Sequence, residues 1–129
     1  MATQHQKLNL TQVEDDAPAN GFGDRWEARV ARADLGAEQT GVTYLRLRSG
    51  KRSPFAHRHT EAEEIYVVLG GSGSVKLDDE VIEVHQLDAV RVSPPVARAF
   101  EAGPEGLELL AFGPHYDNDG EPVDDPWVR

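Results

Sequence analysis

Two histidines separated by one residue, followed by an acidic stretch, have the residue types and spacing needed to bind a metal. His57 and His59 lie in PFAHRHTEAEEIYVV, and Glu64 follows them. In a strand, residues two apart project to the same face, so the two imidazoles would lie about 7 Å apart along it. Two histidines and a carboxylate with open positions suit one divalent Fe, Mn, Ni or Zn ion. The alternative is an exposed strand beside a charged turn formed by Glu61 and Glu63.

The elements that position these side chains are predicted to be short β-strands. Between Arg25 and Phe112, apolar and polar residues alternate in short runs that Gly, Pro, Asp and Ser interrupt. No run has a sustained helical apolar period, and the pattern is typical of an antiparallel β-sandwich or barrel. Residues 76–84 read as a hairpin with Asp78 and Asp79 at its tip. The strands are expected near residues 25–31, 42–48, 63–70, 73–78, 80–85, 88–92, 97–102 and 107–112.

The chain length and composition indicate one all-β domain with polar extensions. A chain of 129 residues fits one domain, and it contains no cysteine, which excludes disulfides and thiolate chemistry. We expect an N-terminal arm over residues 1–20, the barrel over 21–112 and a C-terminal tail over 113–129. The DNDGE run of the tail does not fit a calcium loop, because Pro122 stands where the glycine is required.

The charge and hydropathy of the chain narrow the classes of partner. The formal net charge is −10, which repels phosphate backbones and disfavours a role on nucleic acids. No basic and apolar leader opens the chain, and no apolar run approaches the roughly 20 residues that span a bilayer. We therefore predict a cytoplasmic protein that acts neither on membranes nor on nucleic acid.

The histidine-containing stretch resembles the first signature motif of the cupin superfamily. The matching positions are Gly50, His57, His59, Glu64 and Gly71, with a gap after Gly50 that is one residue longer than usual. The resemblance covers residues 42–112. It implies a single antiparallel β-barrel of the jelly-roll type, with His57, His59 and Glu64 as metal ligands facing inward. It also implies a homodimer, since members of this superfamily commonly dimerise.

The second cupin motif departs from the family pattern at all of its signature positions. These positions are Leu87, Ser93, Pro95, Arg98 and Ala102, and Arg98 replaces the third histidine ligand. A guanidinium has no lone pair for a metal. Its charge about 5 Å from a divalent ion would cost about 6–7 kcal/mol at an effective dielectric of 20. An inward arginine needs a partner, and Glu64 is the natural one.

Two functional interpretations remain open on the sequence. In the first, a divalent ion is held by His57, His59 and Glu64, and Arg98 orients a small anionic ligand. In the second, the barrel has no metal, Arg98 pairs with Glu64, and the protein is a ligand-binding or structural cupin. We predict Arg98, Tyr66 and Phe100 as ligand-binding residues. Enzymatic activity stays unassigned, because one fold serves many functions.

Overall fold

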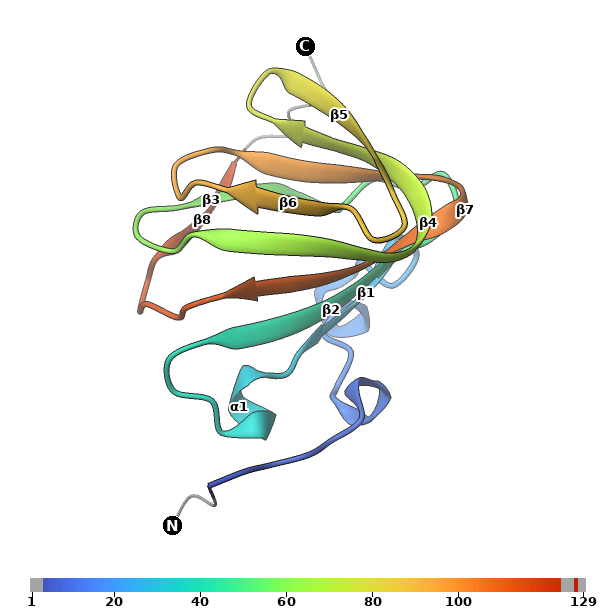
Figure 1. Cartoon of the computed structure of the whole chain (residues 1–129). Coiled ribbons are helices and arrows are strands. Elements are labelled where there is room, and N and C mark those ends of the chain that lie inside the picture. Colours follow the sequence, from blue (N-terminus) through green and yellow to red (C-terminus); the bar gives the residue numbers. More distant parts are fainter. Residues whose placement is uncertain (1–3, 124–126, 128–129) are drawn as a thin grey trace.

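A computed structural model describes residues 4–123 and residue 127 of the chain. Eight antiparallel strands form one curled sheet in the order β1-β2-β7-β3-β8, and β4 adds pairs with β5, β6 and β7 (Figure 1). Within the described part of the chain, helix is limited to two 3-10 turns, Leu10–Gln12 and Pro18–Asn20, and to α1, Arg32–Leu35. The strands are β1 Trp26–Val30, β2 Gly41–Leu47, β3 Ala56–His59, β4 Glu64–Leu77, β5 Glu80–His85, β6 Ala89–Val92, β7 Arg98–Gly113 and β8 Gly120–Val123. The predicted all-β jelly-roll architecture is confirmed.

Two long strands, β4 and β7, run through the whole sheet and replace four shorter strands predicted from the sequence. Residues 63–70 and 73–78 were expected as two strands, and so were 97–102 and 107–112; each pair is one continuous strand. The glycines between them bend the strands instead of ending them. The register of β4 on β7 shifts between Val68 and Gly70 and again between Gly71 and Gly73. These irregularities let one sheet curl round its own core.

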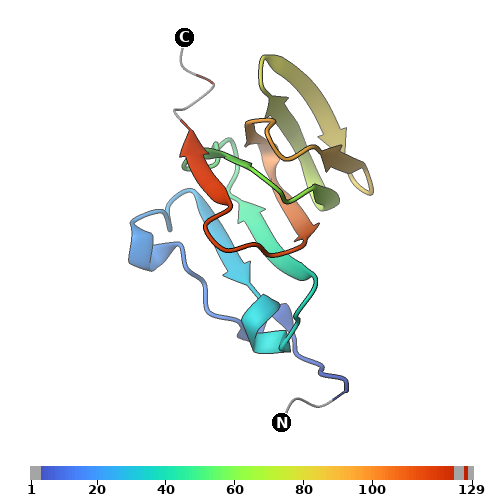
Figure 2. The same ribbon diagram turned by 90° about the vertical axis from the view of Figure 1, so that its left-hand side faces the viewer.

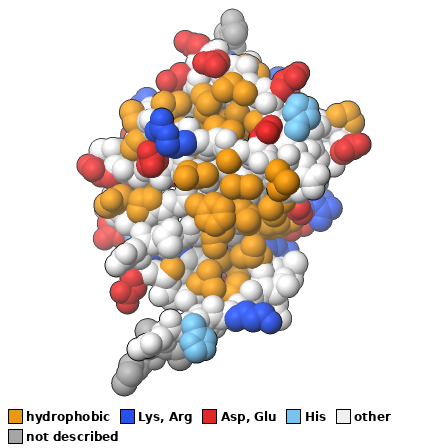
Figure 3. Space-filling model, viewed as in Figure 1, with side chains coloured by type: hydrophobic (Ala, Val, Ile, Leu, Met, Phe, Trp, Pro, Cys, Tyr) orange, Lys and Arg blue, Asp and Glu red, His pale blue; other side chains and the backbone are white. Residues whose placement is uncertain are grey.

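The inner face of the curled sheet carries the apolar core. Alternation in β4 buries Tyr66 and Val68, whereas Ile65, just before Tyr66, points outward and is exposed. On the outer face, Ile65 pairs with the similarly exposed Phe112, and Figure 3 shows hydrophobic side chains gathered on that side. The core cluster includes Trp26, Leu45, Leu47, Tyr66, Val68, Val75, Val92, Phe100, Leu107, Leu109 and Ala111.

Both terminal segments pack against the sheet. Val13 and Ala17 are buried, and the Asp16 amide donates a hydrogen bond to the Ala28 carbonyl at 2.8 Å. At the other end, β8 pairs with β3, and both views place the segment from residue 4 to β1 along the outer strands (Figures 1 and 2). The domain bounds at residues 20 and 112 stay a prediction. Residues 1–3 of the predicted arm, and 124–126 and 128–129 of the tail, lie outside the described residues.

The tail residue Trp127 is half-buried. The Arg52 guanidinium lies 4.9 Å from the centroid of its ring, a cation–π contact. No helix among the described residues is long and apolar enough to cross a membrane.

Gly71 offers a direct test of the β4 bend. It has φ +73°, and a methyl group there would lie 2.0 Å from the Gly106 carbonyl oxygen. Gly50 has a similar φ of +68° and open space around it, so Gly50→Ala isolates the backbone cost of about 1 kcal/mol. We expect Gly71→Ala to lower the free energy of unfolding by at least about 2 kcal/mol more than Gly50→Ala, because the neighbouring backbone must move. Urea denaturation measures both; equal losses would contradict this account.

Candidate metal and ligand site

Strand β3 and the start of β4 bring His57, His59 and Glu64 together. The β3 sequence AHRH alternates, so His57 and His59 share one face and are half-buried, while Ala56 and Arg58 lie on the other face. A short turn then returns the chain to Glu64 at the beginning of β4. Ligand atoms of the three side chains all lie within 4.8 Å of one another. The convergence expected from the strand alternation is therefore present.

The spacing of these atoms suits a single ion. The Nε2 atoms of His57 and His59 lie 3.3 Å and 3.2 Å from Glu64 Oε1. Ligands at about 2.1 Å from one ion are about 3.0–3.4 Å apart when the angle between them is octahedral or tetrahedral. Both distances to Glu64 fall in that range, and all three ligand atoms lie within 4.8 Å of one another, so the cluster is compact enough for one divalent ion.

The Glu64 carboxylate also binds two further side chains. The Tyr66 hydroxyl donates to Oε1 at 2.6 Å, and Arg98 Nη1 donates to the same oxygen at 2.7 Å. Burial raises the pKa of Glu64, but the contacts with His57, His59 and Tyr66 outweigh it and hold the pKa well below its usual range. Burial and the adjacent carboxylate raise the pKa of Tyr66 well above its usual value, so the hydroxyl stays protonated and donates. Glu64 is thus a fixed negative charge.

Arg98 faces inward and pairs with Glu64, the partner expected from the sequence, but it is turned away from open space. Its side chain is 0% exposed, and it begins β7 in register with His57. Besides the pair with Glu64, its Nε and Nη2 atoms donate to the backbone carbonyls of Ser93, Pro94 and Val96 at 2.8–3.1 Å. All three nitrogens of the guanidinium are therefore engaged by protein oxygens.

Asp119 is a site residue that the sequence analysis missed. Its carboxylate accepts the backbone N–H groups of Thr60, Glu61 and Ala62 at 3.1, 2.6 and 3.0 Å, which fixes the turn between β3 and β4. The same carboxylate lies 3.0 Å from His59 Nδ1. Burial would raise the pKa of Asp119, but the backbone donors and His59 hold it below its usual value. Asp119 lies in the DNDG run just before β8. The sequence was tested there for a calcium loop, and no other role was expected of this run.

The Asp119 contact sets the state of His59. A carboxylate only accepts, so Nδ1 carries the proton and Nε2 of the neutral ring keeps its lone pair. This Nε2 is buried and has no hydrogen-bond partner, since its approach to Glu64 lacks hydrogen-bond geometry. The Glu64 carboxylate raises the pKa of His59 above its usual value, although burial opposes this. An ion that binds the ring nitrogen therefore competes with a proton for it. The unsatisfied nitrogen and the N/O donor set fit a divalent ion.

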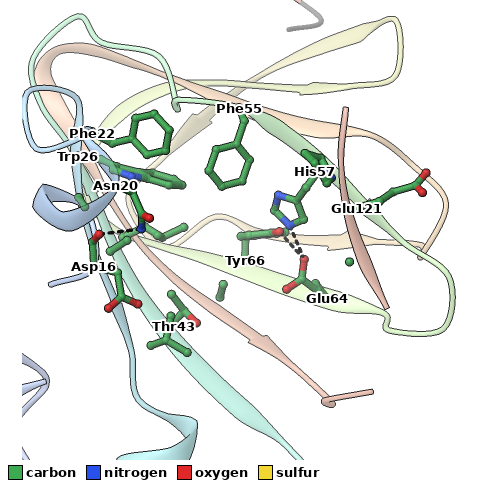
Figure 4. A pocket seen from close by; sticks show the side chains of 17 residues that line it. Asp16, Asn20, Phe22, Trp26, Thr43, Phe55, His57, Glu64, Tyr66 and Glu121 are labelled. Atoms are coloured by element: carbon green, nitrogen blue, oxygen red, sulfur yellow. Dashed lines mark hydrogen bonds and ion pairs between the residues drawn. The ribbon is translucent and has the colours of Figure 1, made fainter. Parts of the chain in front are cut away.

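A cavity of about 600 Å³ opens beside these residues (Figure 4). His57, Glu64 and Tyr66 form one end, and the aromatic rings of Phe22, Trp26 and Phe55 line the other. The remaining lining residues come from the N-terminal segment, β1, β2, β7 and β8: Asp16, Ala17, Asn20, Ala28, Val30, Thr43, Leu45, Ala111, Gly120, Glu121 and Pro122. The sequence analysis had placed the first of these segments in an arm.

The other candidate residues lie in different surroundings. Of the predicted ligand-binding residues, Tyr66 lines the cavity, whereas Arg98 and Phe100 do not. Phe100 is buried behind Tyr66, with the ring centroids 4.9 Å apart. His85 ends β5 with its side chain 68% exposed, as expected for a solvated histidine.

Comparison with protein families gives no match to any family model, and no curated protein matches the sequence. Solved structures do match. A cupin protein from Bacteroides fragilis superposes with a TM-score of 0.72 at 24% identity, covering 91% of this chain and 89% of that one. A sugar phosphate isomerase from a cupin superfamily, from Silicibacter pomeroyi, gives a TM-score of 0.76 at 21% identity over 92% and 82% of the two chains.

A third structure, oxalate decarboxylase from Bacillus subtilis, has a TM-score of 0.76 at 18% identity. The match covers 95% of this chain but 33% of that longer one. The strand order, the inward-facing histidine pair and these structural neighbours agree with the resemblance found in the sequence. The chain has the fold of the cupin superfamily.

Proposed function

We propose that this protein binds one divalent ion through His57, His59 and Glu64 and a small molecule in the adjoining cavity. The observation that carries the proposal is the unsatisfied Nε2 of His59, which the Asp119 contact orients toward the other two donor atoms. Two imidazoles and a carboxylate suit Fe, Mn, Ni or Zn. The cavity volume lies in the range of small-molecule sites.

The residues of the chain would divide the work in the following way. When bound, the ion would supply Lewis-acid polarisation of a ligand oxygen at the polar end of the cavity. Asp119 would hold His59 in one tautomer and orientation, a common role for a carboxylate behind a metal-binding histidine. Tyr66 and Arg98 would fix the Glu64 carboxylate in place. The aromatic walls would exclude water from the bound molecule.

The competing interpretation has no ion, and one observation favours it. The pair between Arg98 and Glu64 is complete without a metal, and Arg98 lies where the cupin pattern has a further histidine ligand. A cation in the site would share Glu64 with Arg98 and meet the repulsion of the guanidinium. On our proposal that repulsion lowers the affinity for the ion without abolishing binding, since Glu64 offers a carboxylate with two oxygens.

Arg98 gives no support to the expected anionic ligand. Its guanidinium is fully buried, is engaged by protein oxygens and does not line the cavity. Its contribution in our proposal is to hold Glu64. The substrates named for two structural neighbours, a sugar phosphate and oxalate, are anions, and identities of 21% and 18% do not carry them over. The reaction, if one occurs, is left unassigned.

The predicted homodimer and cytoplasmic location stay predictions. A second copy of the chain could cover the exposed apolar pair Ile65 and Phe112 on the outer face of the sheet.

The histidine cluster gives the first test of the proposal. We expect purified protein exposed to Ni²⁺ and desalted to retain about one ion per chain. His57→Ala removes one of three ligands and should abolish retention. His85→Ala serves as the matched control, because His85 is exposed and lies outside the cluster, and it should retain the ion. Elemental analysis reads out both variants. Retention by His57→Ala, or loss in His85→Ala, would contradict the proposed ligand set.

Arg98 gives the second test. Replacing it with histidine removes the repelling charge and adds an imidazole, so Arg98→His should bind Zn²⁺ or Ni²⁺ at least about tenfold more tightly, or about 1.4 kcal/mol. Arg98→Lys keeps the positive charge and should show no such gain. Isothermal titration measures the affinities, and circular dichroism checks that both variants are folded. Equal affinity of Arg98→His and the wild type would show that Arg98 does not oppose the ion.

A further inference from the structure

Among the residues that the structure describes, no Lys or Arg lines the cavity beside the metal cluster. Its charged lining residues are the carboxylates Asp16, Glu64 and Glu121. Glu64 is paired with the buried Arg98, and Glu121 is paired with Arg58 on the surface. Neither arginine therefore points its charge into the cavity. Figure 4 shows the Glu121 carboxylate pointing away from the aromatic rings. An anionic group placed at the aromatic end of the cavity, away from the ion, would lose its hydration without gaining a cationic partner.

Aromatic rings lead from the far end of the cavity to the metal cluster. The Phe55 ring centroid lies 6.0 Å from Phe22 and 5.9 Å from Trp26, the latter in an edge-to-face arrangement. On its other side, Phe55 lies 6.3 Å from the ring of His57, which in turn lies 5.2 Å from His59. A flat ring system in contact with this row gains the edge and face contacts that aromatic pairs prefer.

The apolar lining is partly uncovered in the described structure. Phe55 is 38% exposed and Val30 is 49% exposed, and both line the cavity. Exposed apolar surface in a concave, polar-rimmed site is typical of a binding surface. His57, Glu64 and the Tyr66 hydroxyl lie at the opposite end, whereas the polar residues Asp16, Asn20 and Thr43 lie on the side of Trp26 (Figure 4).

The wall on the N-terminal side is held in place by hydrogen bonds. Asp15 Oδ1 accepts the amide groups of Ala17 and Ala28, each at 3.0 Å, which ties the segment before β1 to β1 itself. Ala17 is buried at 2% exposure. Phe22 and Asn20 are therefore presented to the cavity by an ordered segment, which reduces the conformational entropy lost on binding.

We propose that the ligand of this cavity is an uncharged, flat aromatic compound with one hydroxyl group directed at His57 and Glu64. This inference rests on the proposed function and adds the ligand class. The ligand would be a phenol of about two or three fused rings, not a sugar phosphate or a dicarboxylate. The ring body contacts Phe22, Trp26 and Phe55, and the hydroxyl lies at the end where the ion would bind. An anionic group at the far end of the ring would find no Lys or Arg partner among the described lining residues.

Matched probes test the ligand class. 2-Naphthol has one hydroxyl on two fused rings, and 6-hydroxynaphthalene-2-sulfonate is the same compound with an anionic group at the far end. In isothermal titration of the whole chain, with and without Ni²⁺, we expect saturable binding of one 2-naphthol per chain. The sulfonate should bind at least about tenfold more weakly because its charge is desolvated without a partner. Glucose 6-phosphate and oxalate should bind more weakly than 2-naphthol.

Two phenylalanine variants locate the binding. Phe55→Ala removes a ring from the cavity and should weaken 2-naphthol binding by about threefold or more. Phe112→Ala is the control, because Phe112 is 37% exposed, close to the 38% of Phe55, but lies on the outer face of the sheet. It should leave the affinity unchanged. Absent 2-naphthol binding, tighter binding of any of the anions, or equal effects of the two variants would overturn the inference.

The outcomes separate this inference from the proposed function. Retention of Ni²⁺ that depends on His57, without binding of 2-naphthol, would leave the ion site standing and reject the ligand class. Binding of 2-naphthol by protein that retains no Ni²⁺ would uphold the ligand class and reject the ion.

Discussion

A single carboxylate oxygen, Glu64 Oε1, lies within 3.3 Å of nitrogen or oxygen atoms from four side chains: His57, His59, Tyr66 and Arg98. A partly buried carboxylate is costly unless its charge is matched. Here the neighbouring groups keep it ionised, which gives the barrel a permanent negative charge where two histidine nitrogens converge. The arrangement has two consequences: it positions a ligand for a cation, and it engages Arg98 so fully that the guanidinium cannot also serve a ligand in the cavity.

The site depends on segments from both ends of the described chain. Asp119 precedes β8 and reaches back across 60 positions of sequence to His59 and the turn that follows it. The segment before β1 supplies one wall of the cavity through Asp16, Asn20 and Phe22. The strands of the barrel alone would leave His59 without its orienting carboxylate and the aromatic end of the cavity open. The terminal segments therefore complete a site whose donor atoms come from β3 and β4.

The parts of the site that could be predicted from the sequence are those governed by local periodicity. Side chains two apart in a strand share a face, so His57 and His59 were expected together, and the same alternation placed Arg98 inside near Glu64. The cupin resemblance supplied the barrel. The glycine-rich stretch from Gly70 to Gly73 was misread, because glycine marks a bulge within a strand as readily as the end of one.

Contacts between distant segments could not be predicted in the same way. The polar composition of residues 1–20 suggested an arm, yet the burial of Val13 and Ala17 depends on a sheet face that only the folded chain presents. Asp119 lies in an acidic run of ordinary appearance, and its role follows from the pairing of β8 with β3. The aromatic row likewise joins Phe55, in the loop before β3, to Phe22 and Trp26 at the start of β1.

The central claim is that an ion and Arg98 share the Glu64 carboxylate. Anomalous diffraction from crystals grown with Zn²⁺ tests this most directly, because it locates the metal among its ligands. Our account predicts one anomalous peak at about 2.0–2.2 Å from His57 Nε2, His59 Nε2 and a Glu64 oxygen, with Arg98 still bound to the carboxylate. The account would be contradicted if Zn²⁺ bound at other histidines and gave no peak at His57, His59 and Glu64. A peak too far from His59 and Glu64 for them to be ligands would also contradict it.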